Sequence, residues 1–451
     1  MAVALAALPS LLGGCASSPP DMEPGRLVAD AAGLETAIAL HDALPLDLDA
    51  PRPDRLTRAD ASALAVRNRP DVQAALADVQ AALATARQAR LLSNPVLDLN
   101  VRFGGESEVV EAALAQPLID LLARPARSRM ADARLRASAQ RAVEAALDVL
   151  RETEATYARA IAAEAQLDLL DQQAELLDRL LAVAEARRAA GEATRLDVVG
   201  FLARQAALNA RSIGTRAEAD SSRLTLARLI GQPSTDAAFA LDADRSATEI
   251  PGEADTLRVA LKSRPEVQAQ LLELAALGEE VRLARLDVFE GLAAGVEAET
   301  EDSASAGPAV SLPIPIFDFG TTARDAASAE VLAARHRLTG LGRRVIEEVR
   351  QARVALLAAE EAASSVGQTL LPLQRDRVDQ TRAAYEAGFA DVTDVLAAEG
   401  DLLEAEATLV DARLRRDLAA ADLRRATAGV ADDSMDNPFL ADLSARPGSR
   451  P

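Results

Sequence analysis

The chain has 451 residues, a formal net charge of −21 and a pI near 4.7. This acidic balance argues against a nucleic-acid ligand, because phosphate binding requires clustered Lys and Arg. Aromatic residues make up 2% of the chain and Trp is absent, which disfavours a large aromatic-rich globular core. Abundant Ala, Leu, Glu and Arg are typical of long packed helices.

The segment MAVALAALPSLLGGC is an apolar run that ends at the only cysteine of the sequence, Cys15. It resembles a bacterial lipoprotein signal, which implies that residues 1–14 are a signal peptide and that Cys15 carries lipid, palmitate included. The residues that follow, Ala16 and Ser17, imply sorting to the outer membrane. A buried thiol or a plain secretory signal remains an alternative, because the run lacks the leading Lys or Arg of signal peptides.

Two segments of the sequence are each repeated later in the chain, and the two repeats lie at nearly the same distance from their first copies. The segment AAGEATRLDVV at 189–199 is echoed by AGFADVTDVL at 387–396, a shift of 197 residues. RPDVQAAL at 69–76 is echoed by RPEVQAQL at 264–271, a shift of 195 residues. A period this long indicates a duplication rather than a solenoid array.

These echoes set the predicted domain boundaries. We expect a first structural repeat at 56–250 and a second at 251–430. Residues 15–55 contain several prolines and show no regular hydrophobic spacing, which predicts an extended N-terminal linker. Residues 431–451 have the same character and predict a flexible C-terminal tail.

The apolar spacing inside each repeat is helical. Residues 127–190 contain neither Pro nor Gly, so a single helix there would be about 95 Å long at 1.5 Å per residue. The matching span 321–387 is expected to be bent or broken, because it contains Gly340, Gly342, Gly367 and Pro372. Apolar residues also recur every seven positions, which places them in one stripe along the helix. Such a stripe requires a neighbouring helix to cover it. These residues include Leu169, Leu176 and Val183 in the first repeat and Val395, Leu402 and Leu409 in the second.

Four short segments break the helical period. NPVLDLNVRF alternates apolar and polar residues from Leu97 to Phe103, which predicts a β-strand. Weaker versions lie at 108–117, 289–299 and 306–315. Each is about ten residues long, the length of a tilted transmembrane strand. Four strands cannot close a barrel, and lipid cannot satisfy free strand edges, so the strands predict an oligomer.

Several motifs together resemble the TolC-type outer-membrane efflux protein family. They are SNPVLDLNV opening the first strand, LPIPIFDFG closing the fourth, and YEAGFADVTDVLAAEGDLLEAE near the end. The resemblance covers about residues 56–430. It implies a mainly α fold with a small β part: a homotrimer with a coiled-coil helical tunnel, in which four strands per chain contribute to one twelve-stranded transmembrane barrel.

The repeated phrase predicts two helical hairpin tips. Gly191 and Gly388 suit the left-handed position after a helix end, and Thr194 with Asp197 forms a Thr-x-x-acid helix start that Asp391 and Asp394 repeat. The resemblance implies that these tips close the periplasmic end of the tunnel and contact an adaptor. Asp394 matches a constricting acidic position, and Asp197 and Tyr385 match its bracing partners.

One departure from the family pattern concerns the gate. Ala390 stands where a basic residue is expected, so Arg195 is the candidate to replace it. The alternative for Asp197 and Asp394 is a purely structural role, in which each acid only stabilises a helix N-terminus.

The sequence offers little for catalysis. Its two histidines, His41 and His336, provide neither a His-based triad nor a His-rich metal site, and no P-loop is present. We therefore expect no enzyme activity, no cofactor and no metal centre.

The predicted function is a passive outer-membrane export channel of a tripartite efflux system. The resemblance implies a periplasmic adaptor (membrane fusion) protein, an inner-membrane pump of the RND type and outer-membrane lipid as partners, and a cargo closer to heavy-metal cations than to drugs. A lipid-anchored periplasmic coiled-coil adaptor or structural protein remains the alternative. The four strand segments distinguish the export channel from this alternative, because only the channel spans the membrane.

Overall fold

The computed structural model describes residues 19–20, 22–42, 54–103, 109–231, 239–242, 252–300 and 304–428. The signal peptide, Cys15, parts of the predicted linker and the C-terminal tail lie outside these ranges. Within them the fold is mainly helical with a small β part, as predicted.

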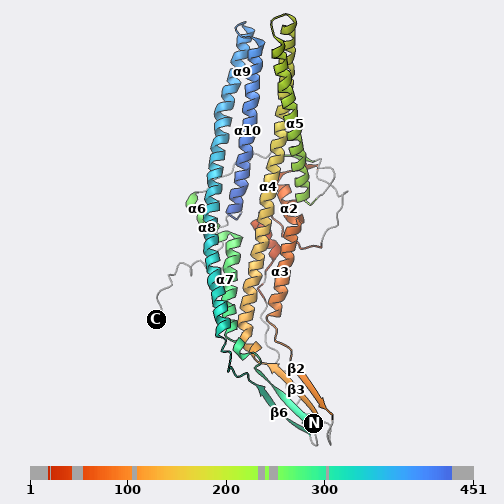
Figure 1. Cartoon of the computed structure of the whole chain (residues 1–451), viewed down its shortest axis with the longest axis vertical. Coiled ribbons are helices and arrows are strands. Elements are labelled where there is room, and N and C mark those ends of the chain that lie inside the picture. The colour runs from red at the N-terminus through yellow and green to blue at the C-terminus, as the bar shows by residue number, and fades with distance from the viewer. Residues whose placement is uncertain are drawn as a thin grey trace. The chain divides into compact units, whose positions relative to one another are not determined.

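The same order of elements occurs twice along the chain (Figure 1). The first series comprises α2 (Arg58–Asn68), α3 (Pro70–Gln88), β2 (Val96–Arg102), β3 (Val109–Pro117), α4 (Ile119–Ala189) and α5 (Arg195–Leu229). The second comprises α6 (Glu253–Ser263), α7 (Pro265–Ala284), β5 (Ala293–Thr300), β6 (Ala304–Ser311), α8 (Thr321–Ser365), α9 (Leu371–Glu386) and α10 (Val392–Ala426). Five short elements complete the described part of the chain. They are α1 (Pro24–Ala31), β1 (Arg55–Leu56), β4 (Ala240–Leu241), the 3₁₀ helix η1 (Asp287–Phe289) and the π-helical turn η2 (Val366–Leu370).

The chain folds into two compact units, and each takes segments from both series. The strand unit contains residues 74–142 and 265–343, and the tip unit contains residues 28–73, 143–264 and 344–451. The duplication in the sequence therefore does not correspond to two separate bodies. Each unit is built from both halves of the chain.

The strand unit contains one four-stranded antiparallel sheet in the order β2-β3-β5-β6 (Figure 1). The central pair, β3 with β5, joins the first series to the second. Its register places Leu114 opposite Leu97 on one side and opposite Val296 on the other. Because side chains alternate across a sheet, this register decides which residues share a face.

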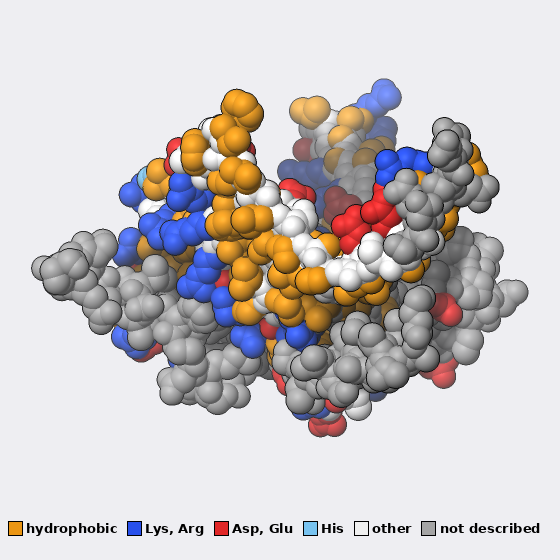
Figure 2. Space-filling model, turned by 90° about the horizontal axis from the view of Figure 1, so that it is seen from below, with side chains coloured by type: hydrophobic (Ala, Val, Ile, Leu, Met, Phe, Trp, Pro, Cys, Tyr) orange, Lys and Arg blue, Asp and Glu red, His pale blue; other side chains and the backbone are white. Residues whose placement is uncertain are grey.

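The two faces of this sheet differ in polarity. Aligned rows across the strands place Leu97, Leu114, Val296 and Pro308 on one face. The neighbouring rows place acidic and polar residues on the opposite face, namely Asp98, Asn100, Glu111, Glu297, Glu299 and Ser305. Seen from the strand end in Figure 2, a band of hydrophobic side chains runs across the surface and acidic side chains gather beside it.

An ion-paired carboxylate, Asp120, lies in the first turn of α4. Asp120 accepts a hydrogen bond from the Ser93 hydroxyl and lies 2.7 Å from the Arg127 guanidinium. Burial raises the pKa of Asp120, but the bonds from Ser93 and the charge of Arg127 outweigh it, so its net pKa lies below the ordinary value. The contribution of Asp120 to stability is therefore present above about pH 4 and is lost as the pH falls further.

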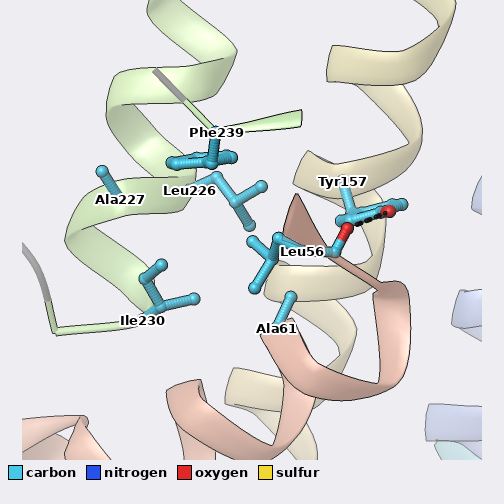
Figure 3. Packing of buried hydrophobic residues seen from close by; sticks show 7 residues of the cluster. All are labelled: Leu56, Ala61, Tyr157, Leu226, Ala227, Ile230 and Phe239. Carbon is cyan, nitrogen blue, oxygen red and sulfur yellow. Dashed lines mark hydrogen bonds between the residues drawn. The ribbon is translucent and has the colours of Figure 1, made fainter. Parts of the chain in front are cut away.

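The tip unit has a small core centred on Tyr157 of α4 (Figure 3). The Tyr157 hydroxyl lies 2.8 Å from the carbonyl oxygens of Leu56 and Asp242 and accepts a hydrogen bond from the Asp242 backbone N–H at 2.9 Å. These contacts hold the two-stranded parallel sheet β1–β4 against the helix. Leu226, Ile230 and Phe239 pack around it.

Several local predictions are corrected by the structure. Pro24–Ala31, expected to be an extended linker, forms α1. Gly340 and Gly342 do not interrupt α8, because a helix tolerates an isolated glycine at an energetic cost. The irregularity is instead a π-helical turn at Val366–Leu370, which contains Gly367 and precedes Pro372, and the chain stays helical through it from α8 into α9.

The strand and helix boundaries agree more closely. The third strand begins at Ala293 rather than at Phe289, which belongs to η1, and the fourth ends at Ser311. The long helix predicted for 127–190 is continuous in α4, which has 71 residues. Among the described residues, no helix is long and apolar enough to cross a membrane.

We predict that Tyr157→Phe lowers the free energy of unfolding by about 1 to 3 kcal/mol, because it leaves buried backbone groups without their partner. The measurement is the thermal midpoint of the purified protein. Tyr385→Phe is the matched control, since Tyr385 is the other tyrosine of the chain and is 47% exposed. Equal midpoints for the two variants would contradict this role of Tyr157.

Candidate functional site: the helical hairpin tips

The first hairpin tip joins α4 to α5. Gly191 has φ of +80°, its N–H donates to the Arg188 carbonyl at 3.0 Å, and the Glu192 N–H donates to the Arg187 carbonyl at 2.8 Å. This pair of bonds is the Schellman helix ending, which requires a left-handed residue and therefore favours glycine. The chain then reverses direction within five residues.

The next helix begins with a capping box. Thr194 is the N-cap of α5, and its N–H and hydroxyl both donate to the Asp197 carboxylate at 2.8 Å, while the Asp197 N–H donates back to the Thr194 hydroxyl at 3.4 Å. These bonds lower the pKa of Asp197 below its ordinary value, with the backbone bond from Thr194 as the main cause. The box is therefore complete above about pH 4 and weakens below it.

The second tip, between α9 and α10, repeats this geometry. Gly388 has φ of +78°, and its N–H donates to the Tyr385 carbonyl at 3.0 Å. Asp391 is the N-cap of α10, and its N–H donates to the Asp394 carboxylate at 2.9 Å. The sequence echo thus encodes the same turn and the same helix start at both tips.

Ion pairs connect the two hairpins of one chain within the tip unit. Arg187, in the last turn of α4, pairs with Asp391 at the start of α10. Further along, the Glu399 carboxylate of α10 lies 3.2 Å from Arg179 of α4 and 3.2 Å from Arg382 of α9. Asp391 therefore caps its own helix and also holds the neighbouring hairpin.

The structure brings only some of the predicted gate residues together. Asp197 and Asp394 each bond to the N-cap residue of their own helix, as the structural alternative expects. Tyr385 contributes its carbonyl to the turn, and its side chain is half exposed. Within the described part of the chain, Arg195 forms no ion pair, and the arginine that joins the tips is Arg187.

Arg187, Arg179 and Glu399 were not anticipated from the sequence. All three lie in regular helix and look like ordinary surface charges there. Their partners are about 200 residues away in the sequence, a separation at which charge spacing along one helix carries no information. The only available signal was the repeat offset itself, which places the ends of α4 and α9 at equivalent positions.

Comparison with known proteins identifies the family of this chain. The model of the outer membrane efflux protein family matches residues 61–232 and again residues 256–429. The two matches cover more than half of the chain, and the chain therefore belongs to the outer membrane efflux protein family. The double match also follows the two series of elements.

One curated relative is the pyoverdine export outer membrane protein OpmQ of Pseudomonas putida. It is 27% identical over 269 residues, which cover 51% of this chain and 55% of OpmQ. The aligned region thus spans about half the length of this relative.

Solved structures show the same fold. A membrane protein from Pseudomonas aeruginosa aligns with a TM-score of 0.66 and 21% identity over 82% of this chain and 93% of its own. Outer membrane protein VceC from Vibrio cholerae gives a TM-score of 0.65 and 19% identity over 82% and 96%. The open state of the Neisseria gonorrhoeae MtrE outer membrane channel gives 0.66 and 17% over 92% and 98%.

We predict that Gly191→Ala and Gly388→Ala each destabilise their tip by about 1 kcal/mol, because alanine is strained at positive φ. Hydrogen exchange of peptides that cover the tips measures this local effect. Gly200→Ala is the control, since Gly200 lies inside α5 with open space around it, and alanine there should slow exchange. Unchanged exchange at both tips would argue against the Schellman endings.

Proposed function

We propose that three copies of this chain form a passive export channel of the outer membrane. The channel continues into the periplasm as a helical tunnel, is gated at the hairpin tips, and is driven by an inner-membrane pump through an adaptor. Membership of the outer membrane efflux protein family supports this proposal and favours it over a periplasmic adaptor or structural rod. The two-faced sheet is the single observation that carries it.

This sheet has the properties of one part of a barrel wall. Its strands have seven to nine residues, one face is apolar and the other carries Asp98, Glu111 and Glu297. In the part of the chain described, β2 and β6 are its edges. An edge in lipid leaves backbone groups without partners, so closure requires strands from other copies. Three copies would supply twelve strands, with the acidic face toward a water-filled interior that favours cations.

The helices of the tip unit also leave apolar faces uncovered. On α5, Val199, Leu202, Ile213 and Leu224 are 45–64% exposed, although the opposite face packs within the chain. The α8–α9 pair exposes Val354, Leu357 and Leu373. Isolated exposed apolar residues are common, but aligned ones on a long helix favour a partner helix. Packing between copies in a tunnel would cover both faces.

The tips supply the proposed gate. In a trimer, the Arg187–Asp391 and Arg179–Glu399 pairs would each occur three times and hold the two hairpins of every chain together. By the family resemblance, Asp394 narrows the opening, and Asp197 and Tyr385 brace it. Separation of the hairpins would break the ion pairs and widen the passage.

The same tips offer a surface for the adaptor. Phe389 follows Gly388 and is 89% exposed, and Leu196 follows the Thr194 cap and is 78% exposed. Exposed apolar side chains at a helix–helix turn are a suitable contact for a protein partner. The turn residues Gly191, Thr194, Gly388 and Asp391 hold them in place.

The first test concerns the assembly. We predict that the mature protein is a lipidated trimer in the outer-membrane fraction, measured by native mass in detergent. Cys15→Ala should remove the acyl mass while the trimer stays in the membrane, because strand pairing does not depend on the lipid. A soluble monomer would exclude the proposed channel.

The second test concerns the gate. We predict that Arg187→Glu raises the single-channel conductance of the purified trimer in planar bilayers, because it replaces an attraction by a repulsion with Asp391. The double variant Arg187→Glu/Asp391→Arg should restore the low conductance. Asp394→Ala should raise conductance and weaken block by divalent cations from the periplasmic side, because a multivalent cation neutralises several close carboxylates at once.

Asp197→Ala is the comparison for these variants, because it removes a capping box without removing the proposed constriction. It should change conductance less than Asp394→Ala and leave cation block nearly intact. If Asp394→Ala lowers the thermal midpoint but conducts as the wild type does, Asp394 has only the structural role. If Arg187→Glu is also indistinguishable from wild type, the tips are not the gate.

A further inference from the structure

A cavity of about 240 Å³ lies inside the tip unit, where the start of α2 meets α4 and α10. On α4, Ala158, Ala162 and Ala165 line it at steps of four and three residues, and their small side chains leave the space. Ala165 is about 36 Å along the helix from the end of α4 at Ala189, so the cavity is separate from the hairpin tips. It is smaller than the roughly 300 to 1,000 Å³ of pockets for drug-sized ligands, and its size fits a small molecule.

Polar contacts on both sides of the cavity fix the spacing of α4 and α10. Toward the tips, the Gln166 side-chain amide donates to the Asp411 carboxylate at 2.7 Å. On the other side, the Arg424 guanidinium lies 2.6 Å from the Glu154 carboxylate. Because these contacts hold the two helices above and below the alanines, the helices cannot close the gap without breaking one of them. The cavity is therefore a built feature of the helix pair.

The charges around the cavity are mainly positive. In a chain with a net charge of −21, its lining contains three arginines and two aspartates. Arg58 and Arg416 share one carboxylate, Asp417, at 3.7 Å and 2.9 Å. These three side chains are only 20–25% exposed, so water screens them weakly. Within the described part of the chain, the buried Nε of Arg58 has no hydrogen-bond partner. A buried donor of this kind calls for an acceptor.

The sequence repeat shows that the fold does not require arginine at position 58. Arg58 is the first residue of α2, and at the shift of 195 residues its counterpart is Glu253, the first residue of α6. A positive charge at a helix N-terminus opposes the helix dipole, whereas an acid is favourable there. The second repeat thus follows the local preference and the first contradicts it. Such a departure is typical of a residue that is retained for function.

The two sides of the cavity indicate a ligand with a charged group and an apolar part. The planar guanidinium groups of Arg58 and Arg416 match the geometry of a carboxylate. About 10 Å along α10 from Asp417, toward the tips, Val410 lines the cavity together with Ala165 of α4. A neutral apolar molecule would leave the Arg58 donor without a partner, and a small inorganic anion would leave the apolar side unfilled. A cation would be repelled by the arginines.

We propose that this cavity binds a small organic carboxylate with a short apolar chain. The carboxylate lies at Arg58 and Arg416, and the chain points toward Ala165 and Val410. The bound molecule connects α2 to the α4–α10 pair and therefore stabilises the tip unit. All of these residues belong to one copy of the chain, so the site does not depend on the proposed channel.

Equilibrium dialysis tests the site with hexanoate as the probe, because hexanoate has one carboxylate and a short alkyl chain. Radiolabelled hexanoate is dialysed against the full chain purified in detergent, with the same detergent in both chambers. We expect saturable binding. Hexanamide, which has the same shape without the charge, and acetate, which has the charge without the chain, should each compete at least about tenfold less well than unlabelled hexanoate.

Two variants locate the binding in this cavity. Arg58→Gln should weaken hexanoate binding at least about tenfold, because it removes the charge and the unpartnered donor. Arg258→Gln is the matched control, since the Arg258 side chain lies on α6 and is 73% exposed. Ala165→Leu should also weaken hexanoate binding, because it fills the apolar side. Hexanoate should raise the thermal midpoint of the wild type and of Arg258→Gln, but not that of Arg58→Gln.

The remaining outcomes would overturn the proposal. Wild-type protein without saturable binding has no such site. Acetate that competes as well as hexanoate means that the cavity holds a simple anion and does not recognise the apolar chain. Equal weakening by Arg58→Gln and Arg258→Gln means that binding follows net charge alone. If Arg58→Gln does not fold, Ala165→Leu decides, and unchanged hexanoate binding in that variant excludes the cavity. None of these results bears on the proposed channel.

Discussion

The antiparallel pairing of β3 with β5 is the contact on which the rest of the strand unit depends. It joins the two series of elements in one sheet, and its register places Leu114 between Leu97 and Val296. A slip of one residue in either neighbouring strand would move that strand's apolar residues to the acidic side. The sheet has one polar and one apolar face only because the register of its four strands, which come from both halves of the chain, aligns apolar residues with apolar residues.

The sheet also shows why a single chain is incomplete. Among the described residues, its strands are paired in the middle and open at β2 and β6, whereas a helix pairs its backbone internally except at its two ends. Water also tolerates the scattered apolar side chains that the helices leave uncovered. The proposed assembly therefore follows most directly from the strands, and the exposed apolar residues of α5, α8 and α9 indicate where further contacts between copies can form.

The tips show how one local motif can take on two roles. Gly191 and Gly388 end their helices in the same conformation, and Asp197 and Asp394 occupy the same position in two capping boxes. Only the second tip also pairs its N-cap residue, Asp391, with Arg187 of the other hairpin. In the proposed gate, the capping boxes keep each tip rigid while the ion pairs between hairpins determine whether they stay together.

The sequence by itself determined the features that depend on neighbouring residues. Alternation identified the strand from Leu97, heptad spacing identified α4 and α10, and the Gly and Thr-x-x-Asp pattern located both tips, because caps and periodicity are local rules. Only the tertiary structure decided that α8 continues through Gly340 and that Arg187, rather than Arg195, joins the tips. Packing along a long helix offsets the weak propensity of one glycine, and a salt bridge across 200 residues depends on how the helices are placed beside each other.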